Sequence, residues 1–180
     1  MRIHDHLVCC GAAALDLGAF TAFLYAFNLR EKINDISEAA SGQRFHPSYT
    51  RVGGLLCDVD DVWITKIRAF IKLFYSAYAD LMKLLQRNRI FVDRTRGVGV
   101  LTKEEAINRS ATGPIARASG VTRDLRKDQP YLAYKDFDFK VVCSTEGDCY
   151  ARFLVRMEEM VQSIKIITQA VENIPSGPIN

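Results

Sequence analysis

The sequence predicts a mainly α fold, a bundle of three or four long helices with one or two short strands. Residues 4–27 are rich in Ala and Leu, and two later stretches carry apolar residues at alternating spacings of three and four, which places them on one face of a helix. A chain of 180 residues that is 48% hydrophobic can bury one sizeable core. The apolar residues of the two stretches are Ile64, Ile67, Ile71, Phe74, Tyr78, Leu81 and Leu85, and Phe153, Met157, Met160, Ile164, Ile167, Val171 and Ile174.

Residues 4–27 are predicted to form a single long helix. Its length is sufficient to cross a bilayer, so a transmembrane span is one interpretation. Asp16, Gly11, Gly18 and the absence of a basic flank favour the other interpretation, an apolar helix at the centre of the bundle.

The remaining elements follow from local signals. Residues 29–42 are amphipathic and end at Gly42, a residue typical of helix C-termini, and residues 43–54 are predicted to be a loop or short extended segment. Asp60 and Asp61 offer an N-cap to a helix of about 26 residues. The further predictions are a capping box at 102–105, a strand at 136–142 and a last helix that ends at Pro175.

Charge and cysteine content restrict the class of protein. The net charge is only +3, but residues 87–127 hold ten Lys/Arg against four Asp/Glu, a net of +6. Phe91 is the one aromatic residue in that stretch, which disfavours nucleic acid as a partner and favours buried bidentate ion pairs or an acidic partner surface. Five cysteines without a CxxC pair predict neither a disulfide framework nor a metal site, and they fit a reducing compartment. The N-terminal residues do not show the pattern that is typical of a signal peptide.

Asp16 is the first candidate site residue. Its helical neighbours at three and four residues are apolar, so a buried carboxylate here requires a partner elsewhere in the fold or a wet cavity. One interpretation is a buried Asp that accepts hydrogen bonds from backbone groups. The other is a carboxylate beside a cavity that handles protons or orients a ligand.

His46 is the second candidate. It lies between Phe45 and Pro47, and Pro47 excludes His46 from the helical region of the backbone. An ordinary structural histidine and a charge switch near neutral pH both remain open. His4 and His6 are two residues apart and point to different sides of a helix, so they cannot chelate together. The sequence contains no HExxH, P-loop, GxGxxG or GxSxG motif.

Three long strings resemble a known family. They are LDLGAFTAFLYAFNLREKINDISEAASGQRFHPSYTRVGG, RTRGVGVLTKEEAINRSATGPIARASGVTRDLRKDQPYLAY and ARFLVRMEEMVQSIKIITQAVENIPSGPI. They resemble the 49 kDa (D) subunit of respiratory complex I, the NADH:quinone oxidoreductase, which is itself similar to the large subunit of nickel–iron hydrogenases. The chloroplast-type NDH complex has a near relative. No cysteine pair remains in this chain to hold a nickel centre.

The resemblance implies a hydrogenase-large-subunit-like fold and a role in a proton-translocating enzyme. Quinone would be reduced in a cavity between this subunit and the small subunit that carries the terminal [4Fe–4S] cluster. Asp16, in the LDLGA pattern, would pair with a quinone-ligating histidine, and His46, in the QRxH pattern, would approach the cluster. The resemblance assigns no specific roles to Arg94, Arg96, Arg117, Asp124 or Arg126, for which a structural ion network at subunit contacts is expected.

The resemblance further implies that residues 1–180 are a single partial domain, a middle portion without the N-terminal quinone loop and the C-terminal portion. Such a chain is expected to bind no cofactor itself and to be inactive alone, with NADH and quinone used by the whole complex. Its expected partners are the small iron–sulfur subunit, other peripheral-arm subunits, the membrane arm and quinone, but not nucleic acid. It would lie peripherally on the cytoplasmic side of a bacterial membrane, or the matrix or plastid equivalent. The alternatives are a non-catalytic assembly fragment and a membrane-anchored helical protein.

Overall fold

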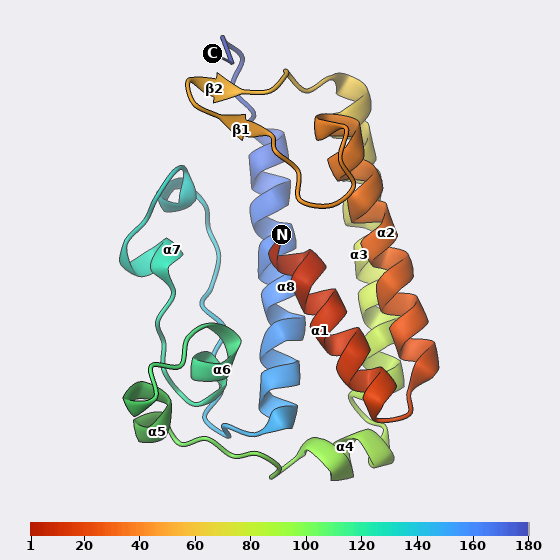
Figure 1. The fold of residues 1–180 in the computed structure, drawn as a ribbon, viewed down its shortest axis with the longest axis vertical. Helices are drawn as coiled ribbons and strands as arrows, with labels where there is room; N and C mark the ends of the chain where they lie inside the picture. Colours follow the sequence, from red (N-terminus) through yellow and green to blue (C-terminus); the bar gives the residue numbers. More distant parts are fainter. Residues whose placement is uncertain (180) are drawn as a thin grey trace.

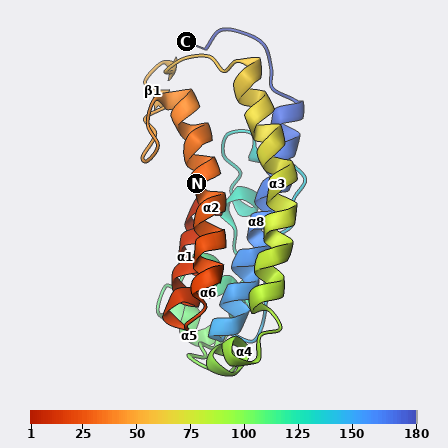
Figure 2. The same cartoon turned by 90° about the vertical axis from the view of Figure 1, so that its right-hand side faces the viewer.

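Four long helices form the body of the molecule in the computed structural model, which describes residues 1–179 (Figure 1). They are α1 (Arg2–Asp16), α2 (Phe20–Ser41), α3 (Asp61–Leu85) and α8 (Cys149–Glu172). Figure 2 shows α2, α3 and α8 running along the length of the molecule. The predicted mainly α bundle is therefore confirmed. The shorter elements are β1 (Thr50–Arg51), β2 (Gly54–Leu55), α4 (Arg89–Thr95), α5 (Lys103–Asn108), α6 (Gly113–Ala118), α7 (Leu125–Asp128) and the 3₁₀ turn η1 (Tyr134–Asp136).

The core lies where the four long helices face one another. Phe74 of α3 is completely buried, and its ring packs on those of Tyr78 and Phe70 at centroid distances of 5.8 and 6.3 Å. Leu7 of α1 and Met157 of α8 meet α3 in the same cluster. Each such apolar side chain contributes roughly 1.5–3 kcal/mol when it leaves water. The predicted stripes are thus the core-facing sides of α3 and α8. The last helix ends earlier than predicted, at Glu172 instead of Pro175, so Ile174 lies beyond α8 and is 42% exposed.

The prediction of a single helix over 4–27 is wrong, because the chain reverses direction after Asp16. The N–H groups of Gly18 and Ala19 donate to the carbonyls of Leu15 and Ala14 at 2.9 and 2.8 Å, which is the double hydrogen bond of a Schellman helix end. Gly18 has a φ of +87°, a conformation that residues with a Cβ adopt only at a cost. The 29–42 helix is accordingly the second half of α2.

The membrane-span interpretation of residues 7–27 fails for the same reason, since the stretch is split between two helices. Across residues 1–179, the structure holds no helix with the length and apolarity that crossing a membrane requires.

The predicted strand at 136–142 is also wrong. This segment lies along α8, and its backbone groups bond to glutamine side chains instead of a neighbouring strand. The Asp138 N–H donates to Gln169 Oε1 and the Asp138 carbonyl accepts from Gln169 Nε2, both at 2.8 Å, while the Lys140 N–H donates to Gln162 Oε1 at 3.0 Å. The alternation reflects that contact, because Phe139 points inward and is buried.

The predicted loop and the other predicted helix ends are confirmed. Residues 43–54 contain one arm of the β1–β2 hairpin, in which Thr50 pairs with Leu55 across a turn at 52–53. Gly42 ends α2 with a φ of +71°. The N–H of Trp63 donates to the Asp60 carboxylate at 2.7 Å at the start of α3, and α5 begins with the predicted capping box at 102–105.

Candidate functional site

Asp16 is the last residue of α1, and its side chain is exposed. The expectation of a buried carboxylate within a continuous helix is therefore wrong, because the helix ends there. Asp16 lines a cavity of about 330 Å³ together with Arg94, Arg152 and Arg156. Within residues 1–179 it has no ion-pair partner closer than 4.0 Å. The carboxylate thus faces a cavity with three arginines on its wall, and its predicted role in handling protons stays a prediction.

His46 lies in the loop that follows α2 and is exposed, with a φ of +54°. Its ring contacts the ring of Phe45 edge-on, at a centroid distance of 4.3 Å. The Phe45 ring in turn lies 5.7 Å from the ring of His4 and under the guanidinium of Arg30. The backbone of His46 is outside the right-handed helical region, as the following proline predicts, and its imidazole is accessible.

The structure does not bring Asp16 and His46 together. Asp16 precedes the first residue of α2, and His46 follows its last. A helix of 22 residues is about 33 Å long. Figure 1 shows the α1–α2 turn and the loop after α2 at opposite ends of that helix. The two predicted residues therefore lie at opposite ends of α2 and cannot contact the same small ligand.

A buried charge lies elsewhere, at Glu159 on α8, which is only 2% exposed. His6 Nε2 of α1 lies 2.8 Å from Glu159 Oε2, and Arg117 Nε of α6 donates to Oε1 at 2.5 Å. Arg2 Nη1 approaches Oε2 at 3.4 Å. Burial by itself raises the pKa of Glu159, but the hydrogen bonds from His6 and Arg117 outweigh it and leave the pKa below its usual value. Glu159 is therefore a charged group inside the fold.

A second buried pair lies next to the first. Arg126 donates to both oxygens of Asp124, from Nε at 3.0 Å and from Nη2 at 2.7 Å. Burial raises the pKa of Asp124, but the hydrogen bonds from Arg126 more than offset it and lower the pKa to about 2. Arg2 joins the pairs, with Nη1 3.5 Å from Asp124 Oδ2 and 3.4 Å from Glu159 Oε2.

We call these six residues the charge cluster. Its members are Arg2, His6, Arg117, Asp124, Arg126 and Glu159, which come from α1, α6, α7 with its N-cap, and α8. The prediction of buried bidentate pairs among the basic residues 87–127 is confirmed at Asp124 and Arg126. Arg94 and Arg96 lie outside the cluster: Arg94 donates to the Leu17 carbonyl at 3.4 Å, and Arg96 lies 4.9 Å from the Tyr150 ring centroid.

The charge cluster borders a cavity of about 640 Å³, which is also lined by residues 110–114, the segment that leads into α6 and its first two residues. Three arginines of the cluster face two carboxylates, so the wall carries an excess of positive charge. Such a wall favours an anion or a carboxylate.

His6 and Glu159 are the residues that sequence reasoning missed. Glu159 does carry a signal, because it follows Val155 by four residues and precedes Ile166 by seven, all three on one helical face and all buried. A carboxylate at such a position predicts a buried cation partner. The identity of that partner has no sequence signal, since His6 is 153 residues away.

The remaining chemical groups are scattered. Within residues 1–179, no three or more His, Cys, Asp or Glu side chains are grouped so as to hold a metal ion. All five cysteines are free.

The fold and the site define a class: a mainly α bundle of long helices with charged residues buried between them. The chain belongs to the family of the respiratory-chain NADH dehydrogenase 49 Kd subunit, whose sequence pattern matches residues 16–180. This family is related to the hydrogenase large subunits. The resemblance in the sequence is thereby confirmed.

Curated relatives agree with the family assignment. The D subunit of the NADH-quinone oxidoreductase of Methylacidiphilum infernorum (isolate V4) is 49% identical over 178 residues, which cover 99% of this chain and 43% of the relative. The H subunit of the NAD(P)H-quinone oxidoreductase of Prochlorococcus marinus (strain MIT 9211) is 48% identical, over 98% of this chain and 45% of the relative. The C/D subunit of the NADH-quinone oxidoreductase of Hydrogenobaculum sp. (strain Y04AAS1) is 51% identical, over 96% of this chain and 30% of the relative. The chain spans less than half the length of these relatives.

Proposed function

We propose that the chain is a core piece of an NADH:quinone oxidoreductase, in which it forms part of the wall of the quinone-reduction cavity. The observation that carries this proposal is the match of residues 16–180 to the 49 Kd subunit family, together with 49% identity to a protein named as the D subunit of an NADH-quinone oxidoreductase. Electrons would pass to quinone from an iron–sulfur cluster on a neighbouring subunit. Quinone reduction takes up protons, so titratable groups at the cavity would couple electron transfer to proton translocation.

Asp16 is the residue of this chain proposed to act at the quinone. Its carboxylate is accessible at the end of α1 and lines a cavity, so a histidine from another segment can reach it. A carboxylate that accepts a hydrogen bond from an imidazole fixes the tautomer of the imidazole and favours the protonated form of the imidazole. Asp16 would in this way tune a histidine that donates a proton to reduced quinone.

His46 is proposed to act at the cluster of the neighbouring subunit. Its imidazole is exposed, so it can face a partner surface. A protonated imidazole near an iron–sulfur cluster would favour the reduced, more negative form by direct Coulomb attraction. The proposal places the chain peripherally on a membrane, in contact with the small iron–sulfur subunit, other peripheral-arm subunits and the membrane arm. The chain itself would hold no cofactor.

The experiment that tests this function is Asp16→Asn in the full assembly. We expect quinone reductase activity to fall by about tenfold or more, because loss of an acid–base partner typically costs at least that much. Assembly should stay intact, since the Asp16 side chain is exposed. Asp80→Asn, on a half-exposed carboxylate of α3, is the matched control. Normal activity in the Asp16→Asn assembly would refute the role.

A non-catalytic assembly fragment is the second candidate. It is favoured by the 43% coverage of the Methylacidiphilum infernorum relative. Affinity purification of the tagged chain in mild detergent, followed by mass spectrometry and an activity assay, separates the two. Co-purified peripheral-arm subunits with quinone reductase activity support the first candidate, and the same subunits without activity support the second.

A further inference from the structure

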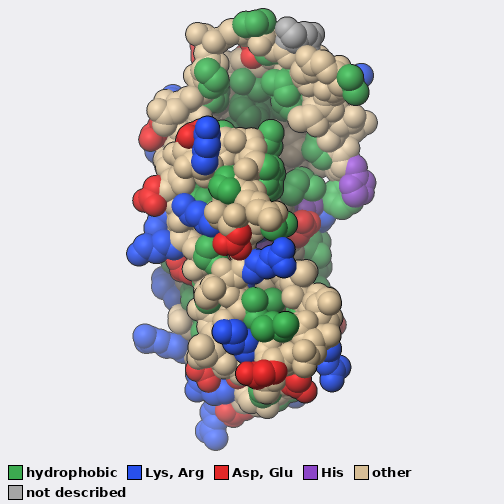
Figure 3. Space-filling view, turned by 90° about the vertical axis from the view of Figure 1, so that its left-hand side faces the viewer, with side chains coloured by type: hydrophobic (Ala, Val, Ile, Leu, Met, Phe, Trp, Pro, Cys, Tyr) green, Lys and Arg blue, Asp and Glu red, His purple; other side chains and the backbone are tan. Residues whose placement is uncertain are grey.

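His46 has a backbone conformation that its sequence disfavours. Its φ is +54°, in the left-handed region, whereas a residue before proline prefers an extended backbone. A residue with a Cβ keeps such a φ only where contacts with its surroundings hold it there. Figure 3 shows histidine atoms standing out from the surface at the edge of one face, and His46 is the one exposed histidine of the three. The contacts that hold it must therefore come from its neighbours in the loop 43–47.

Arg44 is fixed by three carboxylates of α2. Its Nη1 donates to Asp35 Oδ1 at 2.9 Å and to Glu38 Oε2 at 2.8 Å, and its Nη2 donates to Glu31 Oε2. The three acidic residues are spaced by four and three positions, so they lie on one face of the helix. Their hydrogen bonds, that of Glu38 above all, raise the pKa of the Arg44 guanidinium above its usual value. We call these four residues the carboxylate clamp.

Phe45 is anchored by a different contact. The guanidinium carbon of Arg30 lies 5.3 Å from the centroid of the Phe45 ring and 5.3 Å from that of the Phe27 ring. Within residues 1–179, the buried Nε of Arg30 has no hydrogen-bond partner, so the faces of the two rings stabilise the charge there. The two residues before His46 are thus both tied to α2, one by hydrogen bonds and one by a cation–π contact.

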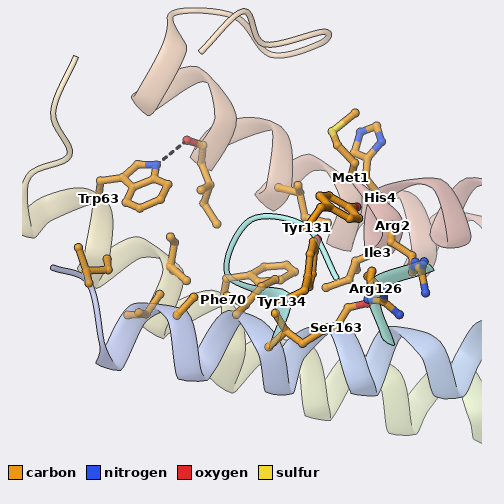
Figure 4. A pocket seen from close by; sticks show the side chains of 18 residues that line it. Met1, Arg2, Ile3, His4, Trp63, Phe70, Arg126, Tyr131, Tyr134 and Ser163 are labelled. Atoms are coloured by element: carbon orange, nitrogen blue, oxygen red, sulfur yellow. Dashed lines mark hydrogen bonds between the residues drawn. The ribbon is translucent and has the colours of Figure 1, made fainter. Parts of the chain in front are cut away.

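Helix α2 gives both contacts a fixed base. Trp63 of α3 donates its indole N–H to the Ile36 carbonyl at 3.0 Å, a bond that fastens the last turns of α2 to α3 (Figure 4). Asn34 is buried and donates from Nδ2 to Glu31 Oε1 at 2.9 Å, which orients one carboxylate of the clamp. The loop is therefore tied to a helix that is itself held in the bundle.

The exposure of the carboxylate clamp decides what it can do. The side chain of Arg44 is 44% exposed and those of its partners are 49–53% exposed, so each ion pair adds little to the stability of the fold. Three pairs on one guanidinium nevertheless restrict its position, because breaking one pair leaves the other two. Ordering a short loop requires far less free energy than folding a domain. The carboxylate clamp can therefore fix residues 43–47 without being needed for the fold.

We propose that Arg44 is a positioning residue for His46. The carboxylate clamp and the Phe45 contact hold the loop 43–47 in one conformation, in which the His46 imidazole keeps a fixed position toward the iron–sulfur cluster of the neighbouring subunit. This role of Arg44 rests on the proposed function of His46. The Coulomb energy between a protonated imidazole and the cluster falls with distance, so an imidazole on a mobile loop would tune the cluster less.

Arg44→Gln in the full assembly tests this role. The pH dependence of the midpoint potential of the cluster should become weaker than in the unaltered assembly, but it should not be lost completely as in His46→Met. Arg44→Lys keeps the charge but cannot present the planar fork of donors, so it should retain more of the pH dependence than Arg44→Gln does. Arg68→Gln, on an exposed arginine of α3, is the matched control and should leave the pH dependence unchanged.

A second variant approaches the same contacts from α2. Asp35→Asn/Glu38→Gln removes the charge of both acceptors of Arg44 Nη1 and should also weaken the pH dependence. Adding Arg44→Gln to this variant should produce little further change, since both changes break the same contacts. In the chain by itself, NMR measures the heteronuclear NOE of the His46 amide, which reports motion on the picosecond to nanosecond timescale. This NOE should decrease in Arg44→Gln and in Asp35→Asn/Glu38→Gln, but not in Arg68→Gln.

The outcomes separate the role of Arg44 from that of His46. If His46→Met removes the pH dependence while both clamp variants keep it in full, Arg44 does not position His46, and the role of His46 stands. If His46→Met itself leaves the pH dependence unchanged, the role of His46 is refuted and that of Arg44 with it. An unchanged NOE of the His46 amide in both clamp variants would also refute the positioning role. A weaker pH dependence together with a lower NOE in both clamp variants would support it.

Discussion

His6 Nε2 of α1 lies 2.8 Å from Glu159 Oε2 of α8, and both side chains are buried. The contact joins residues 153 positions apart, so a charged hydrogen bond helps to fix how the first long helix of the bundle packs on the last. Arg117 completes the arrangement from α6. Buried ion pairs contribute little net stability compared with apolar packing, but breaking one by removing a single partner is costly.

Glu159→Gln should therefore destabilise the chain strongly. The variant leaves the buried guanidinium of Arg117 without a countercharge, and the expected loss in the free energy of unfolding is about 3–5 kcal/mol. Glu158→Gln, on the exposed neighbour in the same helix, should change it by less than about 1 kcal/mol. Urea denaturation of both variants measures the difference. A Glu159→Gln chain as stable as the Glu158→Gln chain would show that the charge cluster does not hold the fold.

Asp124 makes stability depend on pH at the acid end. Its folded pKa, about 2, lies below the unfolded value of 3.8, so its contribution is fully present above about pH 4 and is lost as the pH falls toward 2. The difference corresponds to about 2 kcal/mol. The lowered pKa of Glu159 acts in the same direction.

The measurement is the free energy of unfolding from about pH 6 to about pH 2, the range that spans both pKa values of Asp124. The free energy of unfolding should decrease as the pH is lowered in the unaltered chain, and it should decrease less steeply in the Asp124→Asn variant. The exposed Asp93→Asn should leave the slope unchanged. Equal slopes in all three proteins would contradict the assignment.

Gly147→Ala should be more damaging than Gly18→Ala, although both glycines have positive φ, +66° and +87°. A Cβ at Gly18 meets open space, so only the left-handed backbone is penalised, by about 1–2 kcal/mol. A Cβ at Gly147 would in addition collide with the Leu101 carbonyl oxygen. That collision would break the hydrogen bond from the Leu101 N–H to the Gly147 carbonyl, 3.0 Å long.

Thermal unfolding of the two glycine variants gives the comparison. A lower midpoint for Gly147→Ala than for Gly18→Ala is expected, with hydrogen exchange faster at the Leu101 amide. Equal midpoints would mean that the loop before α8 shifts to accept the methyl group at little cost.

His46→Met tests the proposed neighbour of the iron–sulfur cluster. In the full assembly, we expect the midpoint potential of that cluster to lose its dependence on pH, because methionine cannot bind a proton. Redox titration of the cluster at several pH values provides the measurement, and His4→Asn, a buried histidine bonded to Asn34, serves as the comparison. An unaltered slope in His46→Met would exclude this histidine as the responsible group.

Interactions between residues that are close in the sequence determined much of the fold. The apolar stripes of α3 and α8, the capping residues Asp60 and Thr102, and the C-terminal glycine Gly42 act within a few residues of themselves, and each predicted its helix correctly. The basic segment 87–127 also predicted buried ion pairs, because an arginine guanidinium that is buried among small residues requires a carboxylate partner. The three long sequence strings that resemble the 49 kDa (D) subunit also indicated the family to which the chain belongs.

The tertiary structure decided what depends on distant residues. Gly18 ends α1 because the chain can then fold back and bury Ala22 and Ala26 against it, whereas local composition allowed the helix to continue. Residues 136–142 alternate like a strand, but the amide-bearing side chains of α8 satisfy their backbone. The contact between His6 and Glu159 and the exposure of Asp16 both depend on how α1 packs against the other helices. Pairing between remote segments depends on the packing of the whole bundle, and no short stretch of sequence carries that information.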